Sequence, residues 1–137
     1  MRSAWKPPAP GDIVWCHFPE APAPGPGPKP RPALVLAVVT HDDGCVVHVA
    51  YGTSQRVDSL KAGEFACLKS GNPQAFALAG LSFDTKFNLN VALELPWTEE
   101  FFKVPPRAPH GQTPKLGVLH PSLLRAAKAA FYAAAGR

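Results

Sequence analysis

Hydrophobic and polar positions divide the first half of the chain into extended segments. Residues 13–18 are rich in β-branched and aromatic side chains, which favours a strand. Residues 33–39 are apolar without alternation, and such a run predicts a central strand covered on both faces. A turn signal at residues 41–44 separates this run from the apolar residues 45–51. We therefore expect the two apolar runs to pair as a hairpin.

Weaker strand patterns follow in the second half of the chain. Residues 63–68 predict a short strand after a glycine turn. Residues 80–87 alternate apolar and polar side chains, which predicts a strand that residues 88–95 continue. If Thr85 is excluded from the core, one change of register is needed between Phe83 and Phe87. The side chains of this strand expected to point inward are Leu81, Phe83 and Phe87.

Helical patterns occur at two places. Residues 74–78 predict one helical turn with Asn72 near its cap. The one convincing helix covers residues 121–135, where Pro121 suits the first helical position and apolar side chains recur every three or four residues. The apolar stripe expected to pack on the sheet consists of Leu124, Ala127, Phe131 and Ala134.

The pattern as a whole predicts a mainly β protein of about five to seven short strands with a C-terminal α-helix. Strands and helices do not alternate, and a small, strongly bent sheet or partly open barrel suits such a series. The 137 residues fit one domain, 1–137, with an irregular lead at residues 1–10. Many of the 17 prolines fall in residues 19–32, which we expect to form a proline-rich loop that cannot join a sheet.

Net charge and cysteine content restrict the environment and the partners. The formal charge of +4 permits an anionic partner such as nucleic acid, although the basic residues never form a run. Cys16, Cys45 and Cys67 lie far apart in apolar stretches, so we expect buried thiols in a reducing cytoplasm and no disulfide, metal site or cofactor. The longest apolar run is far shorter than the roughly twenty residues that span a membrane, and the N-terminus does not resemble a signal peptide.

Arg31 is the first candidate functional residue. Pro30 and Pro32 favour extended geometry at Lys29 and Arg31, so Arg31 stands where the loop meets the buried strand. A guanidinium is always charged and forks into two hydrogen bonds, which suits a phosphate or carboxylate ligand. The alternative is an ordinary surface ion pair, which is common and weak.

Two further groups of side chains are candidates for binding. Thr53, Ser54 and Gln55 follow the second strand of the hairpin, where hydroxyl and amide groups contact phosphates and base edges or simply satisfy the turn. Trp15 and His17 alternate with core-facing residues of the first strand, so we expect them to be accessible together. A structural histidine is the alternative for His17.

Three motifs together resemble the PemK/MazF family of type II toxin–antitoxin ribonucleases. Residues 11–15, Gly-Asp-Ile-Val-Trp, are similar to the opening strand of the family. Arg31 and Pro32 match an Arg-Pro pair that precedes an apolar strand, and Thr53 and Ser54 match a Thr-Ser pair that ends the next strand. The motifs occur in the order that the family has.

The resemblance implies an SH3-like barrel, usually a homodimer, that cuts single-stranded RNA without a metal ion. The 2′-hydroxyl attacks the adjacent phosphate and leaves a 2′,3′-cyclic phosphate and a 5′-hydroxyl end. Arg31 would neutralise the charge that develops at phosphorus, Thr53 would hold a phosphate oxygen with help from Ser54, and Asp84 is the family-derived general base. The implied role is that of a growth-inhibiting cytoplasmic toxin that cuts mRNA and is neutralised by an antitoxin protein.

The remaining roles stay open at the level of the sequence. His17 and His48 are alternative general bases because imidazole titrates near neutrality. The side chains expected to contact the RNA are Ser54, Gln55, Lys29, His17 and Trp15.

The segment before Arg31 departs from the family. Many members carry a His-Glu-Gln-type loop there, whereas residues 20–30 are nearly all proline, alanine and glycine. One alternative is therefore a barrel of the same family that binds RNA or protein without cutting. Another is an unrelated interaction module that uses residues 19–32 as its recognition segment.

Overall fold

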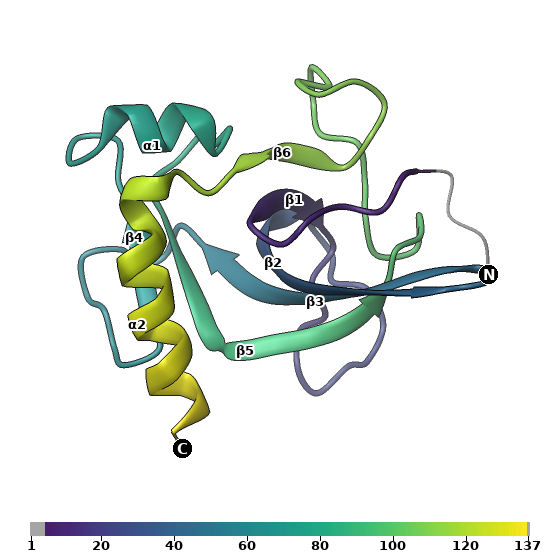
Figure 1. The fold of residues 1–137 in the computed structure, drawn as a ribbon, viewed down its shortest axis with the longest axis horizontal. Coiled ribbons are helices and arrows are strands. Elements are labelled where there is room, and N and C mark those ends of the chain that lie inside the picture. The colour runs from purple at the N-terminus through teal and green to yellow at the C-terminus, as the bar shows by residue number, and fades with distance from the viewer. Residues whose placement is uncertain (1–4, 137) are drawn as a thin grey trace.

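The computed structural model describes residues 5–136 of the chain. Within this range the protein is mainly β, with six antiparallel strands curled into a half-barrel and a helix at the C-terminal end (Figure 1). The strands are β1 (Asp12–Cys16), β2 (Arg31–His41), β3 (Gly44–Thr53), β4 (Glu64–Cys67), β5 (Thr85–Pro96) and β6 (Lys115–Val118). Their order across the sheet is β4-β5-β3-β2-β1-β6. The predicted mainly β fold with a C-terminal helix is confirmed.

The predicted hairpin of β2 and β3 is present and forms the middle of the sheet. The two strands pair up to His41 opposite Gly44, so Asp42 and Asp43 make the turn. The registers between β2 and β3 and between β3 and β5 each shift once. Because such bulges bend a strand and increase its twist, they account for the curl of the long strands.

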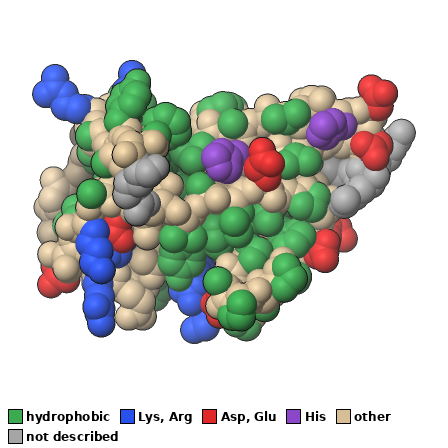
Figure 2. All heavy atoms as spheres, turned by 90° about the horizontal axis from the view of Figure 1, so that it is seen from below, with side chains coloured by type: hydrophobic (Ala, Val, Ile, Leu, Met, Phe, Trp, Pro, Cys, Tyr) green, Lys and Arg blue, Asp and Glu red, His purple; other side chains and the backbone are tan. Residues whose placement is uncertain are grey.

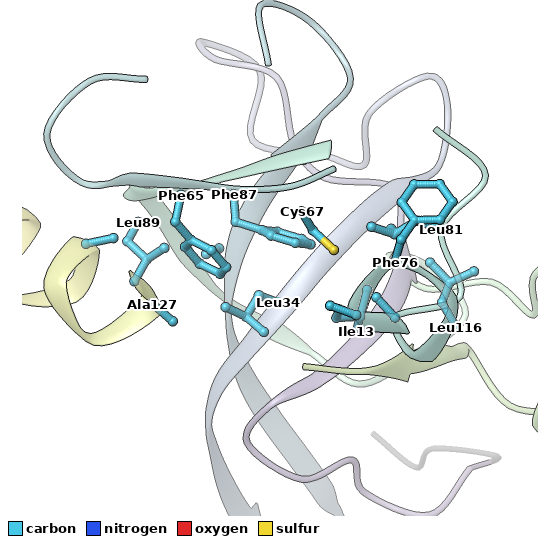
Figure 3. Close-up of a cluster of buried hydrophobic side chains, with 14 residues drawn as sticks. Ile13, Leu34, Phe65, Cys67, Phe76, Leu81, Phe87, Leu89, Leu116 and Ala127 are labelled. Atoms are coloured by element: carbon cyan, nitrogen blue, oxygen red, sulfur yellow. The ribbon is translucent and has the colours of Figure 1, made fainter. Parts of the chain in front are cut away.

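Two hydrophobic clusters lie on opposite faces of the curled sheet. In the first, Phe65 of β4 and Phe87 of β5 point toward Leu34 of β2, and Ala127 approaches from α2 (Leu124–Ala135) (Figure 3). The two rings have centroids 5.6 Å apart. The second cluster uses the alternate residues of the same strands together with aromatic side chains after β5, among them Val14, Cys16, Val35, Val47, Val49, Trp97 and Phe102.

β2 is covered on both faces over its first half only. Ala33, Leu34 and Val35 are buried, which agrees with the predicted central strand. Val39 is 50% exposed, so the prediction of full coverage as far as residue 39 was wrong. The reason is that the distal half of the hairpin extends beyond α2 and the shorter strands (Figure 1).

The C-terminal helix occupies the predicted residues but buries a different stripe. A 3₁₀ turn, η1 (Pro121–Leu123), leads into α2. Ala127 and Ala130 are buried, whereas Leu124 and Phe131 are about half exposed. The expectation that the larger two side chains pack on the sheet was wrong. Alanines let the helix lie close to β4 and β5, and the longer side chains stay at its flank.

Residues 80–84 do not belong to the predicted strand. The chain turns there, and β5 begins only at Thr85. Phe83 is exposed, and Thr85 is buried with its hydroxyl donating to the Phe83 carbonyl oxygen at 2.8 Å. The expected inward orientation of Phe83 was therefore wrong, because a turn interrupts the alternation, whereas Leu81 and Phe87 are buried as expected.

The short helix and the buried thiols agree with the sequence patterns. α1 (Pro73–Leu78) begins after Asn72, whose side-chain oxygen accepts a hydrogen bond from the Ala75 backbone. Cys16, Cys45 and Cys67 are buried free thiols. In the described part of the chain, no helix has both the length and the apolar character needed to cross a membrane.

Candidate functional site

Strand pairing brings Arg31 and Thr53 to the same end of the sheet. Arg31 begins β2 and Thr53 ends β3. Ala33 lies opposite Tyr51, and continuing this antiparallel register by two residues puts Arg31 opposite Thr53. Because cross-strand neighbours point to the same face of a sheet, the guanidinium and the hydroxyl share one end of that face. Two of the three residues assigned to catalysis by the resemblance are therefore neighbours.

Gly52 allows the two strands to approach each other closely at this point. A Cβ atom on Gly52 would lie 2.2 Å from the Pro32 carbonyl oxygen, so a side chain there would push β2 and β3 apart. Gly52 therefore allows the start of β2 to pack against the end of β3.

The guanidinium of Arg31 is partly buried and only weakly paired. Its Nη2 lies 3.6 Å from Oε2 of Glu20, and 24% of the Arg31 side chain is exposed. The Cζ atom lies 5.7 Å from the centroid of the Tyr51 ring, within cation–π range. Nε is buried and has no hydrogen-bond partner among residues 5–136. The group is held by packing while much of its hydrogen-bonding capacity is unused.

Thr53 closes the end of β3 and shapes the turn that follows. Its side chain is nearly buried, and Oγ1 accepts a hydrogen bond from the backbone N–H of Gln55 at 3.1 Å. The hydroxyl keeps its own proton to donate. Ser54 and Gln55 are exposed directly after it.

The proline-rich segment folds back and delivers Glu20 to Arg31. The Gly27 N–H donates to the His17 carbonyl oxygen at 3.1 Å, and His17 Nδ1 lies 3.0 Å from the Gly27 carbonyl oxygen. Because a carbonyl only accepts, Nδ1 carries the proton in this contact. His17 therefore anchors the segment, while Lys29 is exposed near its end.

Trp15 and His17 do not form the shared open face that alternation predicted. Both are half-buried, and Trp15 packs against the first hydrophobic cluster. Ile13 on the same side of β1 is fully buried, so this side is a core face as well. Arg31 pairs with Cys16, which points to the other face of β1. The expectation of joint accessibility was wrong because β1 is covered on both faces.

The three candidate general bases belong to different parts of the fold and have different partners. Asp84 precedes β5, and its Oδ1 accepts a hydrogen bond from the Lys69 backbone N–H at 2.7 Å. His48 lies opposite Glu94 of β5. Since alternate residues of β3 point to opposite faces, His48 faces away from Thr53. His17, as described, binds the proline-rich segment.

The carboxylate that does reach Arg31 belongs to Glu20, which the sequence reasoning missed. Its signal was present, because Glu20 is the one acidic residue among residues 19–32. Tyr51 was missed too, since it lies within an apolar strand and contacts Arg31 only through cross-strand pairing. Both contacts follow from the way the chain folds back at this end of the sheet.

Charge is unevenly distributed along the hairpin. Asp42 and Asp43 lie at its turn, whereas Arg31 and Thr53 lie at its other end. On the face drawn in Figure 2, Lys and Arg side chains stand on the left half, the side on which Figure 1 shows α2, whereas acidic side chains stand on the left, in the middle and at the right-hand end. Along the hairpin itself, an anionic ligand is favoured at the Arg31 end, away from Asp42 and Asp43.

The thiols and carboxylates of the described residues supply neither a reactive nucleophile beside Arg31 nor a metal-binding cluster. Burial raises the pKa of Cys16, the strand partner of Arg31, so this thiol stays protonated and is a poor nucleophile. Among the residues that the structure describes, no group of three His, Cys, Asp or Glu side chains is arranged to hold a metal ion.

Comparison with known proteins gives no family for this chain. No family model matches the sequence, and no curated protein matches it at a significant level. The chemistry of the site has to be inferred from its own residues.

Proposed function

We propose that the protein is an endoribonuclease that binds the scissile phosphate of single-stranded RNA at Arg31 and Thr53. The observation that carries this proposal is a guanidinium with an unpaired Nε donor at the same end of the sheet as the Thr53 hydroxyl. Guanidinium groups bind phosphate oxygens through paired hydrogen bonds. The exposed Ser54 and Gln55 side chains next to this pair are groups that contact RNA.

The proposed reaction is a transesterification within the RNA. The 2′-oxygen attacks the adjacent phosphorus while its proton passes to the carboxylate of Glu20, and the bond from phosphorus to the 5′-oxygen breaks. The 5′-oxygen leaves with a proton from water, and the hydroxide so formed takes the proton from Glu20, which gives a 2′,3′-cyclic phosphate, a 5′-hydroxyl end and the carboxylate again. Arg31 keeps its proton and stabilises the charge on the non-bridging oxygens, and the Thr53 hydroxyl donates to one of them.

Glu20 suits the role of general base because it is close to Arg31 and loosely held. Its side chain is 47% exposed, and the 3.6 Å separation from Nη2 is too long for a good hydrogen bond. An exposed pair of this kind contributes little to stability, so a phosphate displaces the carboxylate at low cost. The carboxylate then remains on the segment that borders the bound RNA.

The test is incubation of the purified protein with mixed-sequence single-stranded RNA, with and without EDTA, followed by mapping of the cut ends. We expect cuts that persist in EDTA and leave cyclic phosphate ends. Arg31→Ala should slow cutting by roughly 10²–10³-fold, the usual cost of removing one preorganised donor. Arg125→Ala removes an exposed arginine from α2 and is the matched control, with an expected rate equal to that of the wild type.

Other outcomes separate the alternative functions. RNA that is retarded on a gel but stays intact would favour a barrel that binds RNA without cutting it. RNA that is neither cut nor retarded would favour the interaction module, with residues 19–32 as its recognition segment.

The PemK/MazF assignment belongs to the same proposal, with its SH3-like barrel, homodimer, toxin activity on mRNA and antitoxin partner. Its support is the order of the motifs at residues 11–15, Arg31-Pro32 and Thr53-Ser54, together with the mainly β fold. Induced expression in a bacterial host should stop growth, and Arg31→Ala should relieve the arrest. Unimpaired growth with well-expressed wild-type protein would contradict the toxin role.

A further inference from the structure

A buried ion pair lies under the loop that follows Thr53. Lys86 of β5 is opposite Thr53 in the sheet. Its Nζ donates to the Ser59 carbonyl oxygen and to Oε1 of Glu64, each at 3.1 Å. The Lys86 and Glu64 side chains are only 8% and 6% exposed. Lysine is rarely buried to this extent unless it is paired, and here the pairing fixes Ser59 of the loop to β5.

The returning half of the same loop is fixed by further hydrogen bonds. Oε1 of Glu64 also accepts from the Lys61 backbone N–H at 2.8 Å. The side-chain amide of Asn90 donates to the Ala62 carbonyl oxygen at 2.8 Å. The Leu89 N–H donates to the Gly63 carbonyl oxygen at 2.8 Å. Residues 59–63 are therefore tied to β5 at several points.

The outgoing half of the loop presents polar side chains to solvent. Ser54, Gln55 and Arg56 are exposed, and they follow directly on the proposed phosphate ligand Thr53. Arg56 has φ of +51°, in the left-handed region that non-glycine residues seldom adopt. The loop thus has an anchored returning half and an exposed polar outgoing half.

We propose that residues 54–63 form a base-reading loop, in which Gln55 and Arg56 select the nucleotide beside the scissile phosphate and Lys86 is the positioning residue. This inference rests on the proposed function. Amide and guanidinium side chains recognise base edges through directed hydrogen bonds, and such recognition requires that the loop be held in place. A buried ion pair is a weak device for stability alone, because desolvation offsets its attraction.

The first experiment compares cut-site preferences on a randomised RNA pool. Gln55→Ala and Arg56→Ala should each lower the preference for one base next to the cut by roughly tenfold. Lys86→Met should flatten the preference at the same position, and Lys86→Arg should restore part of it. Lys103→Met removes an exposed lysine outside the loop and should leave the preference unchanged.

The second experiment measures the loop directly and does not depend on cleavage. Hydrogen exchange of the amides at residues 55–62, and trypsin cleavage after Arg56 and Lys61, should each accelerate roughly tenfold in Lys86→Met. Asn90→Ala leaves no buried charge unpaired, so it tests the same anchoring if Lys86→Met fails to fold. Exchange in β2 and β3 should stay as in the wild type in both variants.

The outcomes separate this inference from the proposed function. Wild-type protein that cuts RNA, with the same base preference in Gln55→Ala, Arg56→Ala and Lys86→Met, would overturn the base-reading loop alone. A loop that exchanges at the wild-type rate in Lys86→Met and Asn90→Ala would overturn the positioning role. Wild-type protein that fails to cut RNA would overturn the proposed function and the base reading with it, whatever the exchange rates show.

Discussion

Glu20 has two opposing effects on RNA in the proposed site. Its carboxylate competes with phosphate for Nη2 of Arg31, and it also takes the proton of the attacking hydroxyl. Glu20→Gln should therefore bind RNA more tightly and cut it roughly 10²–10⁴-fold more slowly, the range for a lost general base. Gel-shift affinity on RNA with a 2′-deoxy cut site and single-turnover rates on cleavable RNA separate the two effects.

The control for Glu20 is Glu100→Gln, which neutralises an exposed carboxylate outside the proposed site and should change neither quantity. Weaker binding of RNA by Glu20→Gln would contradict the competition between carboxylate and phosphate. An unchanged single-turnover rate would contradict the role of Glu20 as the base.

The Thr53 hydroxyl serves both the turn and the proposed phosphate contact. Thr53→Val leaves the Gln55 N–H without its acceptor, so the free energy of unfolding should fall by about 1 kcal/mol. The rate of RNA cleavage by Thr53→Val should fall by more than the small loss of folded protein explains. Thr53→Ser should keep both the stability and the cleavage rate. Urea unfolding and single-turnover rates give the two numbers. A Thr53→Val protein that cuts at the wild-type rate would contradict the phosphate contact.

At the level of single residues, the sequence indicates the positions of Arg31 and Thr53, because local geometry controls both. Arg31 is set by the prolines on either side of it, and Thr53 by the end of an apolar strand. Glu20 and Tyr51 could not be assigned to the site, because their contacts with Arg31 depend on a folded-back loop and on cross-strand register. Neither relationship leaves a local pattern in the chain.

At the level of elements, the predictions succeeded where one segment determines its own structure. The hairpin has a strong turn between two apolar runs, and α1 has its own cap at Asn72. β6 was not predicted, because it is a short strand defined by its pairing with β1 from the opposite end of the chain. The buried stripe of α2 was misassigned because helix packing favoured small side chains over large ones.

The ion pair between Glu64 of β4 and Lys86 of β5 predicts how the stability of the fold depends on pH. Burial alone raises the pKa of Glu64, but the Lys61 N–H and the Lys86 ammonium outweigh this effect and lower it below the usual value. A lowered folded pKa contributes stability that is complete above the unfolded value and lost as pH falls through the folded value. The loss should therefore begin near about pH 4.3, the ordinary glutamate pKa, and continue below it.

Urea unfolding of the wild type and Glu64→Gln between pH 7 and pH 3 checks this pH dependence. The difference in unfolding free energy between the two proteins should be largest near neutrality and shrink in acid. Glu94→Gln, on an exposed part of β5, should not show this pattern. A difference that stays constant across the range would contradict the ionic role of Glu64.

At the level of the whole molecule, the fold separates the two kinds of charge along the hairpin. The net charge of +4 is modest, so its distribution decides where an anion binds. The turn of the hairpin carries Asp42 and Asp43, and the proposed site lies at the far end of the same strands. RNA bound at that end avoids the acidic turn and lies near Lys29 and Arg56, both exposed.

This arrangement predicts how RNA affinity depends on salt. If Lys29 and Arg31 each neutralise one phosphate, the logarithm of the association constant should fall with the logarithm of salt with a slope of about −1.4. Affinity for an uncleavable single strand should then drop roughly sevenfold between about 50 and 200 mM salt, measured by fluorescence anisotropy. Lys29→Ala should make the slope shallower by about 0.7, whereas Lys103→Ala, outside the proposed site, should leave it unchanged. Because release of counterions accompanies every phosphate contact, an affinity that does not change with salt would contradict RNA as the ligand and favour a protein partner.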